Sequence, residues 1–232
     1  LWQANRHAQS SADFEKNNMV LGRYFSPDIK NEIEETGLNF SEYIPKSLNV
    51  AVLFTDIVGF TKLSEKMEPN DVLELLSEYQ TIMVECIFEF NGTVDKFIGD
   101  AVMANFGTPK SYGNDAQNAF DCAKKMKLML HEWNKNRIDN RQKVIEHRIG
   151  IHYGECIVGN VGGEKRVEYT VLGDTVNVAS RLCDLSKIFN NDLLISKALY
   201  DQIEIVEEYE EFDSHPIKGR KEKIDLIRVF LD

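Results

Sequence analysis

The chain has 232 residues, of which 43% are hydrophobic and 28% are charged, a composition typical of soluble globular proteins and unlike disordered or membrane-embedded ones. The formal net charge is −11 and the sequence carries no basic block, which argues against nonspecific nucleic-acid binding. If the ligand is an anion, a few placed Lys or Arg residues or metal ions must therefore neutralise it locally.

The cysteine pattern bears on the cellular compartment. Cys86, Cys122, Cys156 and Cys183 are widely spaced and contain no C-x-x-C pair. This favours a reducing, cytoplasmic location over a disulfide framework. The chain starts without methionine inside a helical pattern, so we expect an upstream part, and that part could tether the full-length protein to a membrane.

The first 22 residues show a thin stripe of apolar positions at helical spacing. Such a stripe fits either a plain surface helix or the end of a coiled coil that leads from a sensor domain, and spacing alone does not choose between them. We expect this helix to end near Ser26-Pro27, because proline restricts the residue before it. Residues 23–48 are mixed in character and are predicted to form a connector.

A folded core begins at Asn49, where the apolar run VAVLFTDI predicts a strand that is covered on both faces. Helical periodicity follows over Leu63–Met67 and Asp71–Phe90, with a break at Pro69-Asn70 between the two helices. The segment GTVDKFIGDAVMANFG predicts a hairpin whose two-residue turn is Gly99-Asp100.

An amphipathic helix over residues 115–137 opens the second half. HRIGIHYGE predicts a strand, and GNVGGEKRVEYTVLG a glycine-rich turn that leads into another strand. Asp174 is expected to N-cap the helix TVNVASRLCDLS, which precedes a short strand, a short helix and two last strands. This order mixes hairpins with crossovers, which favours an α+β sandwich over a doubly wound sheet.

One carboxylate stands out because it lies in a buried strand. Asp56 comes near the end of the apolar run, where an unpaired charge would be costly. It could cap the next turn, accept a phosphoryl group or bind a metal. Asp100, also at the tip of an apolar element, favours the metal because Mg²⁺ takes one or two protein carboxylates. Gly-Asp is also ordinary turn chemistry, so spacing leaves these readings open.

Asn177 and Arg181 form a second candidate pair. They are four residues apart, and therefore lie on one face of the helix that follows Asp174. An Asn and an Arg that project together can hold a ribose and the charge that develops on a phosphorane. The same spacing fits a solvated polar stripe, and by itself the pattern favours that simpler interpretation.

Taken together, these stretches resemble the catalytic domain of class III nucleotidyl cyclases, most closely the bacterial adenylate cyclases. The matching motifs are VLFTDIVGFT, DKFIGDAVMANF, HRIGIHYGECIVGNVG, YTVLGDTVNVASRL and IKGRKE. The resemblance implies a catalytic domain over residues 49–232 with the ferredoxin-like α/β sandwich of that class, a mixed, mainly antiparallel sheet flanked by helices. LGRYFSPDI, residues 21–29, resembles the transducer element that joins such cyclases to upstream sensor domains.

The resemblance also implies roles for particular residues. Two Mg²⁺ or Mn²⁺ ions would be bound by Asp56, Asp100 and the carbonyl of Ile57. The triphosphate would contact the backbone of Val58, Gly59, Phe60 and Thr61 and the side chains of Arg148 and Lys218. Lys96 and Thr170 fall on the positions that read the purine, and Asn177 and Arg181 on the catalytic pair that orients the ribose and stabilises the transition state.

Hydrogen bonding supports adenine as the base. Adenine presents the N1 acceptor and the N6 donor, which suit a lysine donor at Lys96 and a hydroxyl acceptor at Thr170. Guanine calls for an acceptor such as Glu where Lys96 stands, and lysine has no acceptor. Many family members carry Asp at the Thr170 position, whereas threonine is found in a bacterial subset.

The implied protein is a homodimeric adenylate cyclase that converts ATP to 3′,5′-cyclic AMP and pyrophosphate. In the family, the site lies between two head-to-tail subunits, with the metal aspartates on one chain and the purine, Asn and Arg residues on the other. Three rivals are a guanylate cyclase on the same scaffold, a catalytically silent dimeric relay and a receiver domain with Asp56 as phosphoacceptor. The receiver reading fails because no acidic pair lies near an early strand end and the chain is too long.

Overall fold

The structure is a computed structural model, and it describes residues 26–36, 45–163, 166–190, 193–216 and 223–231. The chain divides into two compact units, residues 1–42 and 43–232. In the first unit, helix α2 (Pro27–Thr36) begins with proline at a position that needs no amide hydrogen. A helix therefore starts within the predicted connector, whereas the helix predicted over residues 1–22 lies outside the described residues.

The second unit alternates strands and helices in the order that the sequence predicted. In chain order they are β1 (Lys46–Ile57), α3 (Phe60–Ser64), α4 (Pro69–Glu89), β2 (Thr93–Ile98), β3 (Ala101–Phe106), α5 (Asp115–Asp139), β4 (His147–Gly163), β5 (Arg166–Leu172), α6 (Asp174–Leu185), the short 3-10 helix η3 (Ser186–Phe189), β6 (Leu193–Ser196), α7 (Lys197–Tyr200), β7 (Tyr209–His215) and β8 (Ile224–Val229). No helix among the described residues is long and apolar enough to span a membrane.

Eight strands of the described chain form one sheet, in the order β2-β3-β1-β4-β6-β8-β7, with β5 paired to β4 beside this path. All the described strand pairs are antiparallel except β4 with β6. The predicted mixed, mainly antiparallel sheet is therefore confirmed. The central place of β1 explains its uninterrupted apolar run, because both of its faces are covered.

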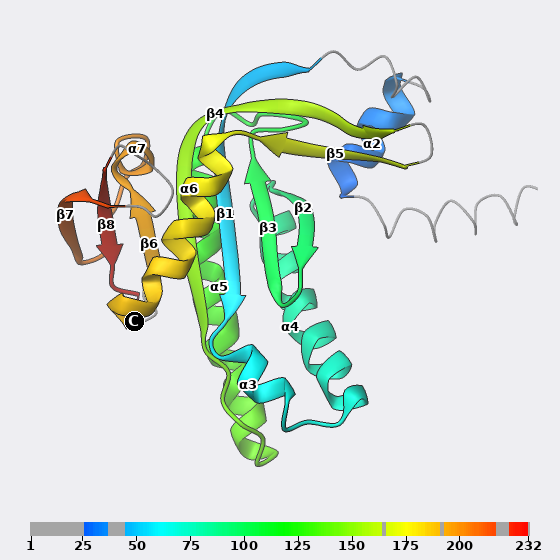
Figure 1. The fold of residues 1–232 in the computed structure, drawn as a ribbon, viewed down its shortest axis with the longest axis vertical. Coiled ribbons are helices and arrows are strands. Elements are labelled where there is room, and N and C mark those ends of the chain that lie inside the picture. The colour runs from blue at the N-terminus through cyan, green and yellow to red at the C-terminus, as the bar shows by residue number, and fades with distance from the viewer. Residues whose placement is uncertain (1–25, 37–44, 164–165, 191–192, 217–222, 232) are drawn as a thin grey trace, which may run out of the picture. The chain divides into compact units, whose positions relative to one another are not determined.

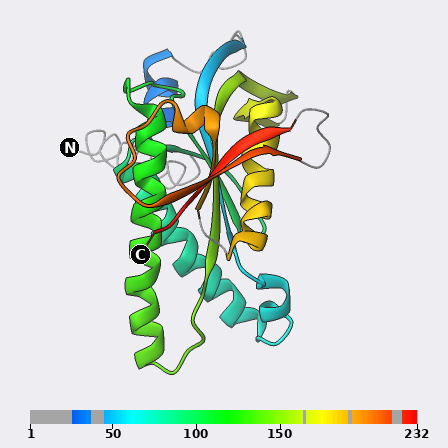
Figure 2. The same ribbon diagram turned by 90° about the vertical axis from the view of Figure 1, so that its left-hand side faces the viewer.

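Helices cover the sheet on both faces. Helices α4 and α5 pack on one face and α6 on the other, as two views at right angles show (Figure 1, Figure 2). The larger core cluster lies under α4 and α5, with Tyr79, Phe120 and Met126 fully buried against the strands. A smaller cluster that includes Val178 and Leu182 lies under α6. One mixed sheet with helices on both faces confirms the predicted α+β sandwich.

Helix α6 packs against β4 at Gly150 with its backbone. A Cβ atom there would lie 2.1 Å from the backbone nitrogen of Cys183 and 2.7 Å from the carbonyl carbon of Leu182. Only glycine permits this approach, because it has no Cβ. Gly150 therefore sets the distance between α6 and β4.

A buried polar cluster joins α4 to the two central strands, β1 and β4. The Thr55 hydroxyl lies 2.8 Å from the Tyr79 hydroxyl and 3.2 Å from Nδ1 of His147. Tyr79 OH and His147 Nδ1 are 3.3 Å apart, and all three side chains are fully buried. Such groups are costly to bury unless they bond one another, so this cluster fixes α4 against β1 and β4.

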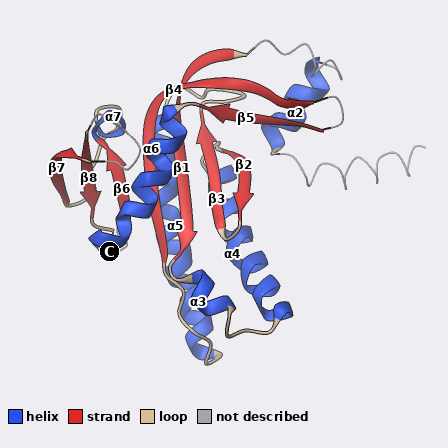
Figure 3. Ribbon diagram, viewed as in Figure 1, coloured by secondary structure: helices blue, strands red, loops and turns tan. Residues whose placement is uncertain are grey.

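Several element boundaries differ from the prediction. Helix α3 begins at Phe60 and not at Leu63, because Gly59 adopts the left-handed conformation that starts the helix early. Strand β4 continues through the GNVGG segment to Gly163, so these residues form a strand and not the predicted turn. Asp174 is the first residue of α6 and not its N-cap; Gly173 takes the capping position. Figure 3 shows the resulting long β4–β5 hairpin that extends from the sheet.

Candidate active site

Asp56 and Asp100 lie at the same end of the sheet. Asp56 is the last residue but one of β1, and Asp100 stands in the tight turn between β2 and β3 after Gly99, whose φ is 64°. The end of β1 and this turn are neighbours in Figure 1. The amide of Ile57 donates a 3.1 Å hydrogen bond to Oδ2 of Asp100, which joins the two elements.

The two carboxylates repel one another. Burial, and then the hydrogen bond and charge of Asp56, raise the pKa of Asp100 to about 7. A cation between the carboxylates would relieve this repulsion, so the donor set fits a divalent metal. Within the described part of the chain, no group of three or more His, Cys, Asp or Glu side chains could hold an ion alone. Water and phosphate oxygens would then complete the shell, as Mg²⁺ prefers.

Arg148 lies directly opposite Asp56 in the β1–β4 register. Its Nη2 atom is 2.5 Å from Oδ2 of Asp56, and only 14% of the Arg148 side chain is exposed. Its Nε atom is buried and has no hydrogen-bond partner among the described residues. A buried unpaired guanidinium N–H is costly, so this atom marks a place where an additional anion would be stabilised.

The loop after Asp56 turns sharply into α3. Gly59 has φ 68°, and there is open space where its Cβ would be. The amide of Val58 donates to the carbonyl of Glu146 at 2.9 Å, whereas Phe60 and Thr61 occupy the first turn of α3. The first amides of a helix have no partner within it, so Phe60 and Thr61 have donors for an external acceptor.

Lys96 and Thr170 come together although they lie on different hairpins. Both contact Asp95: the Thr170 hydroxyl donates to its Oδ1 atom at 2.7 Å, and Lys96 Nζ lies 3.5 Å from the same oxygen. Lys96 Nζ is also 3.1 Å from Oε2 of Glu168, two residues before Thr170 on β5. The structure therefore groups the two predicted purine residues with two carboxylates that the sequence interpretation did not include.

Strand periodicity alone would place Asp95 away from the purine residues. Successive residues of a regular strand point to opposite faces, which would separate Asp95 from Lys96. The β2–β3 register shifts between Val94 and Lys96, so Asp95 is the extra residue of a bulge. Glu168 could have been found from its spacing, since residues 168 and 170 share one face of a strand.

Asn177 and Arg181 lie on the exposed side of α6. Val178 and Leu182 face the core, which leaves both polar side chains in solvent. Arg181 Nη1 is 3.7 Å from Oδ2 of Asp184, an exposed pair one turn further along the helix. Such a pair contributes little to stability.

The described side-chain contacts thus form separate sets. Asp56, Asp100 and Arg148 form one set, and Lys96 and Thr170 form another. Among the described interactions, none joins Asn177 or Arg181 to either set. Lys218 lies outside the described residues.

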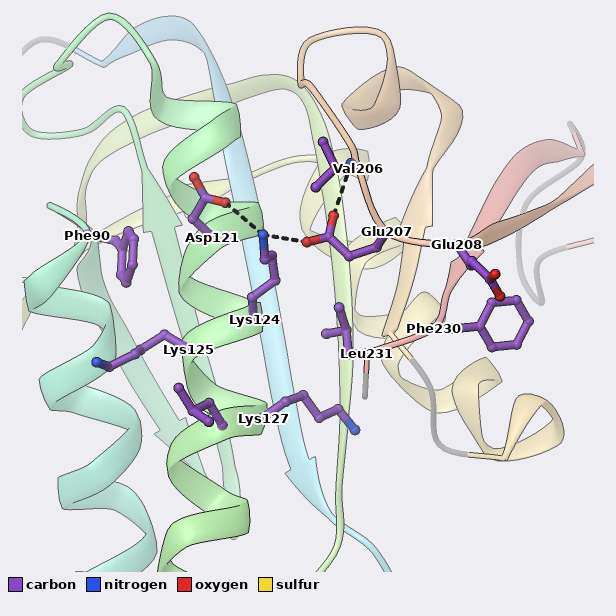
Figure 4. A pocket seen from close by; sticks show the side chains of 11 residues that line it. Phe90, Asp121, Lys124, Lys125, Lys127, Val206, Glu207, Glu208, Phe230 and Leu231 are labelled. Atoms are coloured by element: carbon purple, nitrogen blue, oxygen red, sulfur yellow. Dashed lines mark hydrogen bonds and ion pairs between the residues drawn. The ribbon is translucent and has the colours of Figure 1, made fainter.

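A groove of about 700 Å³ opens in another part of the second unit (Figure 4). It is lined by Phe90, by lysines of α5 and by Leu231 near the last strand. Figure 4 shows Lys124 between two carboxylates, 2.5 Å from Oε1 of Glu207 and 3.8 Å from Oδ1 of Asp121. None of the candidate residues lines this groove.

The sequence matches a known family over most of its length. The family model described as the adenylate and guanylate cyclase catalytic domain matches residues 42–228. Adenylate cyclase 1 of Rhizobium meliloti is 31% identical over 217 residues, which are 86% of this chain and 33% of that protein. This chain therefore spans about a third of that relative.

Solved structures of both nucleotide types match. The adenylyl cyclase CyaB of P. aeruginosa is 34% identical, with a TM-score of 0.73 over 81% of this chain and 96% of that one. The guanylyl cyclase Cya2 is 31% identical, also with a TM-score of 0.73, over 80% of this chain and 93% of that one. Overall similarity therefore does not distinguish the two purines.

Proposed function

Because the chain belongs to the adenylate and guanylate cyclase catalytic domain family, we propose that it converts ATP to 3′,5′-cyclic AMP and pyrophosphate. The ribose 3′-oxygen attacks the α-phosphorus, its proton is released, and the bond to the β-phosphate oxygen breaks. The observation that carries this proposal is a pair of neighbouring carboxylates, Asp56 and Asp100, beside the Arg148 guanidinium. The Nε–H group of this guanidinium is buried and has no hydrogen-bond partner among the described residues.

Asp56, Asp100 and the Ile57 carbonyl would hold two Mg²⁺ or Mn²⁺ ions. When bound, these ions supply a lowered pKa at the 3′-hydroxyl and positive charge at the phosphates. The carboxylates hold this charge at the end of β1, where Asp56 is fixed by its strand and Asp100 by the Ile57 amide. The raised pKa of Asp100, caused by burial and by Asp56, supports a site that is completed by cations.

Arg148 would bind a phosphate oxygen through its free Nε–H while it keeps its contact with Asp56. The amides of Phe60 and Thr61, next to the open space at Gly59, would approach the same triphosphate. Lys218 would add a further positive charge. These contacts hold the chain of phosphates in line with the ribose, which is the main task of the protein in phosphoryl chemistry.

Lys96 and Thr170 would read the purine. Lys96 donates to N1 of adenine, and the Thr170 hydroxyl accepts from the 6-amino group. Lys96 is held by Asp95 and Glu168 in the structure, so it must leave Glu168 to reach the base. A lysine at this position supports adenine over guanine.

Asn177 and Arg181 would complete the site from a second chain. Both are exposed on α6, where Asn177 would orient a ribose and Arg181 would neutralise the phosphorane. The long β4–β5 hairpin supports a head-to-tail homodimer, because it carries several exposed apolar side chains. These are Ile157, Val161, Val167 and Leu172. Solvent-exposed apolar residues gathered on one hairpin are typical of a protein interface.

The proposal extends to the longer protein. This chain spans about a third of its curated relatives, which is consistent with an output domain that follows an upstream sensor. The four cysteines are unpaired and buried, which is consistent with a cytoplasmic domain.

A direct assay tests the function. The purified chain is incubated with ATP and, separately, with GTP, in the presence of Mg²⁺ or Mn²⁺, and the products are separated by chromatography. We expect cyclic AMP and pyrophosphate in equal amounts, with ATP preferred over GTP. A preference for GTP would show that the protein is a guanylate cyclase instead. If a folded, dimeric protein forms no cyclic product, the alternative of a catalytically silent dimeric relay would be favoured.

A further inference from the structure

We propose that Asp95 is a positioning residue that selects a 6-amino purine by fixing the direction of the Thr170 hydroxyl. This inference rests on the proposed function, because it assigns the purine choice at the same site. Asp95 would not touch the base; it would act through Thr170.

The β2 bulge places Asp95 between the two purine residues. Val94 pairs with Ala104 and Lys96 pairs with Met103, so Asp95 has no partner of its own on β3. A bulge redirects the side chain of its extra residue. Here the Asp95 side chain points into the protein, with only 1% of it exposed.

Both carboxylate oxygens of Asp95 are engaged. Oδ1 accepts the Thr170 hydroxyl at 2.7 Å and faces Lys96 Nζ at 3.5 Å. Oδ2 accepts the Val171 amide at 3.2 Å and the Nδ2 group of Asn105 at 3.5 Å. Burial raises the pKa of Asp95, and the bonds from Thr170 and Val171 with the charge of Lys96 oppose this rise. The donors on every side favour an ionised carboxylate that only accepts.

This arrangement decides what the Thr170 hydroxyl can do. A hydroxyl has one proton and two lone pairs, and the proton is used on Asp95. Only lone pairs remain for a ligand, so Thr170 can accept from a 6-amino group but cannot donate to a 6-oxo group. Adenine therefore gains a hydrogen bond where guanine or hypoxanthine would place two acceptors against each other.

Asp95 also links the two strands that carry the purine residues. In the described sheet, β2 pairs only with β3, and β5 only with β4. The bonds from Thr170 and Val171 to Asp95 therefore connect β5 to β2 where no strand ladder does. Loss of these bonds would lower kcat/KM equally for all purine nucleotides, whereas a change in the direction of the hydroxyl would alter the ratio between them.

The sharpest variant is Asp95→Asn, which keeps the size of the side chain. The amide of Val171 still requires an acceptor, so the Asn carbonyl oxygen turns to Val171 and the Asn amino group faces Thr170. The hydroxyl must then accept from Asn, and its proton is no longer held by Asp95. The other acceptor beside it, the Val171 carbonyl at 3.5 Å, lies at the limit of hydrogen bonding, so the hydroxyl can donate outward. Toward the base, the Thr170 hydroxyl then acts as a hydrogen-bond donor and no longer only as an acceptor.

The test compares ATP with purine riboside triphosphate, which lacks only the 6-amino group and keeps the N1 acceptor. In the unaltered protein we expect kcat/KM to favour ATP by about tenfold, as one buried hydrogen bond implies. Asp95→Asn should reduce this ratio to about one, and should improve inosine triphosphate, a 6-oxo substrate, relative to ATP. A general loss of structure would lower all three values together and leave their ratios unchanged.

Asp115→Asn is the matched control. Asp115 also accepts one hydroxyl, from Ser111, and one backbone amide, from Tyr112, but it lies at the start of α5 away from the purine residues. This variant should keep the substrate ratio of the unaltered protein. Asp95→Ala is a second variant, in which no acceptor holds the Thr170 proton, so the ratio should also fall toward one. Ratios are compared only between variants that thermal unfolding shows to be folded.

A double-variant cycle tests whether Asp95 acts through Thr170. Thr170→Val should abolish the preference for ATP by itself, and adding Asp95→Asn should change the ratio no further. If Thr170→Val loses the preference while Asp95→Asn keeps it, the positioning role is wrong although the cyclase function stands. If the unaltered protein turns over no nucleotide, the proposed function itself is wrong.

Discussion

The packing of α6 at Gly150 provides a demanding test of the site geometry. In the variant Gly150→Ala, the new Cβ would meet the backbone of Leu182 and Cys183 at 2.7 Å and 2.1 Å, and the carbonyl oxygen of Ala179 at 2.8 Å. Backbone atoms of a helix cannot turn aside as a flexible side chain can. The whole of α6 must therefore move away from the sheet by about 1 Å, the order of displacement to which catalytic geometry is sensitive.

Two effects of different size should follow. Overpacking of this kind costs about 1–3 kcal/mol, and rigid backbone contacts place Gly150→Ala at the upper end. For a domain of this size, that loss lowers the melting temperature by about 5–10 °C. Because α6 carries Asn177 and Arg181, a shift of about 1 Å should lower kcat about a hundredfold, while the purine residues on β2 and β5 largely keep KM.

The assay is cyclic AMP production at saturating ATP, at a temperature where thermal unfolding shows that the variant is folded. Gly163→Ala serves as the control for stability alone, since Gly163 lies on the same strand and has open space at its Cβ, whereas the hairpin that carries it is the proposed dimer interface. It should alter stability by less than about 1 kcal/mol. Should Gly150→Ala retain both its melting temperature and its kcat, the close approach of α6 and the role of its polar face would be refuted.

Three further outcomes are expected. Asp56→Ala and Asp100→Ala should each abolish cyclic AMP formation without changing the circular dichroism spectrum, and EDTA should abolish it reversibly. Asp71→Ala is the control, because Asp71 is an exposed carboxylate on α4, and it should have no effect. Robust activity of either site variant would contradict the metal assignment. Lys96→Met, which keeps length but removes the donor, should lower kcat/KM for ATP about 10- to 100-fold, and unchanged kinetics would exclude Lys96 from the base. Tyr79→Phe should lower the free energy of unfolding by about 1–3 kcal/mol, because it leaves buried partners short of a hydrogen bond, and an unchanged unfolding curve would show that the cluster is not stabilising.

Much of the fold follows from periodicity. The residues from Val50 to Phe54 are all apolar, as expected for a strand that is covered on both faces, and the Gly99-Asp100 pair indicated the β2–β3 hairpin. The order of strands and helices was predicted correctly for the same reason. Boundaries failed where glycine altered the local conformation, at Gly59 before α3 and along the end of β4 at Gly163.

The candidate site was predictable only in part. The motifs named Asp56, Asp100, Lys96 and Thr170, and the structure brings these residues together in two groups. Asp95 escaped prediction because a bulge depends on the pairing of two strands, which no single stretch of sequence encodes. Periodicity within one chain also does not predict contacts with a second chain. The motifs therefore indicated what Asn177 and Arg181 do, but not which residues of the other chain they face.

Each active site is proposed to be shared by two chains, and complementation tests this sharing most directly. Asp56→Ala and Arg181→Ala, each inactive alone, are unfolded together, refolded as an equal mixture and assayed for cyclic AMP. Half of the dimers then pair unlike chains, and one of the two sites in each such dimer carries neither substitution, so the mixture should recover about a quarter of the unaltered activity. A mixture that stays as inactive as its components, although mixed dimers form, would contradict a site built from two chains.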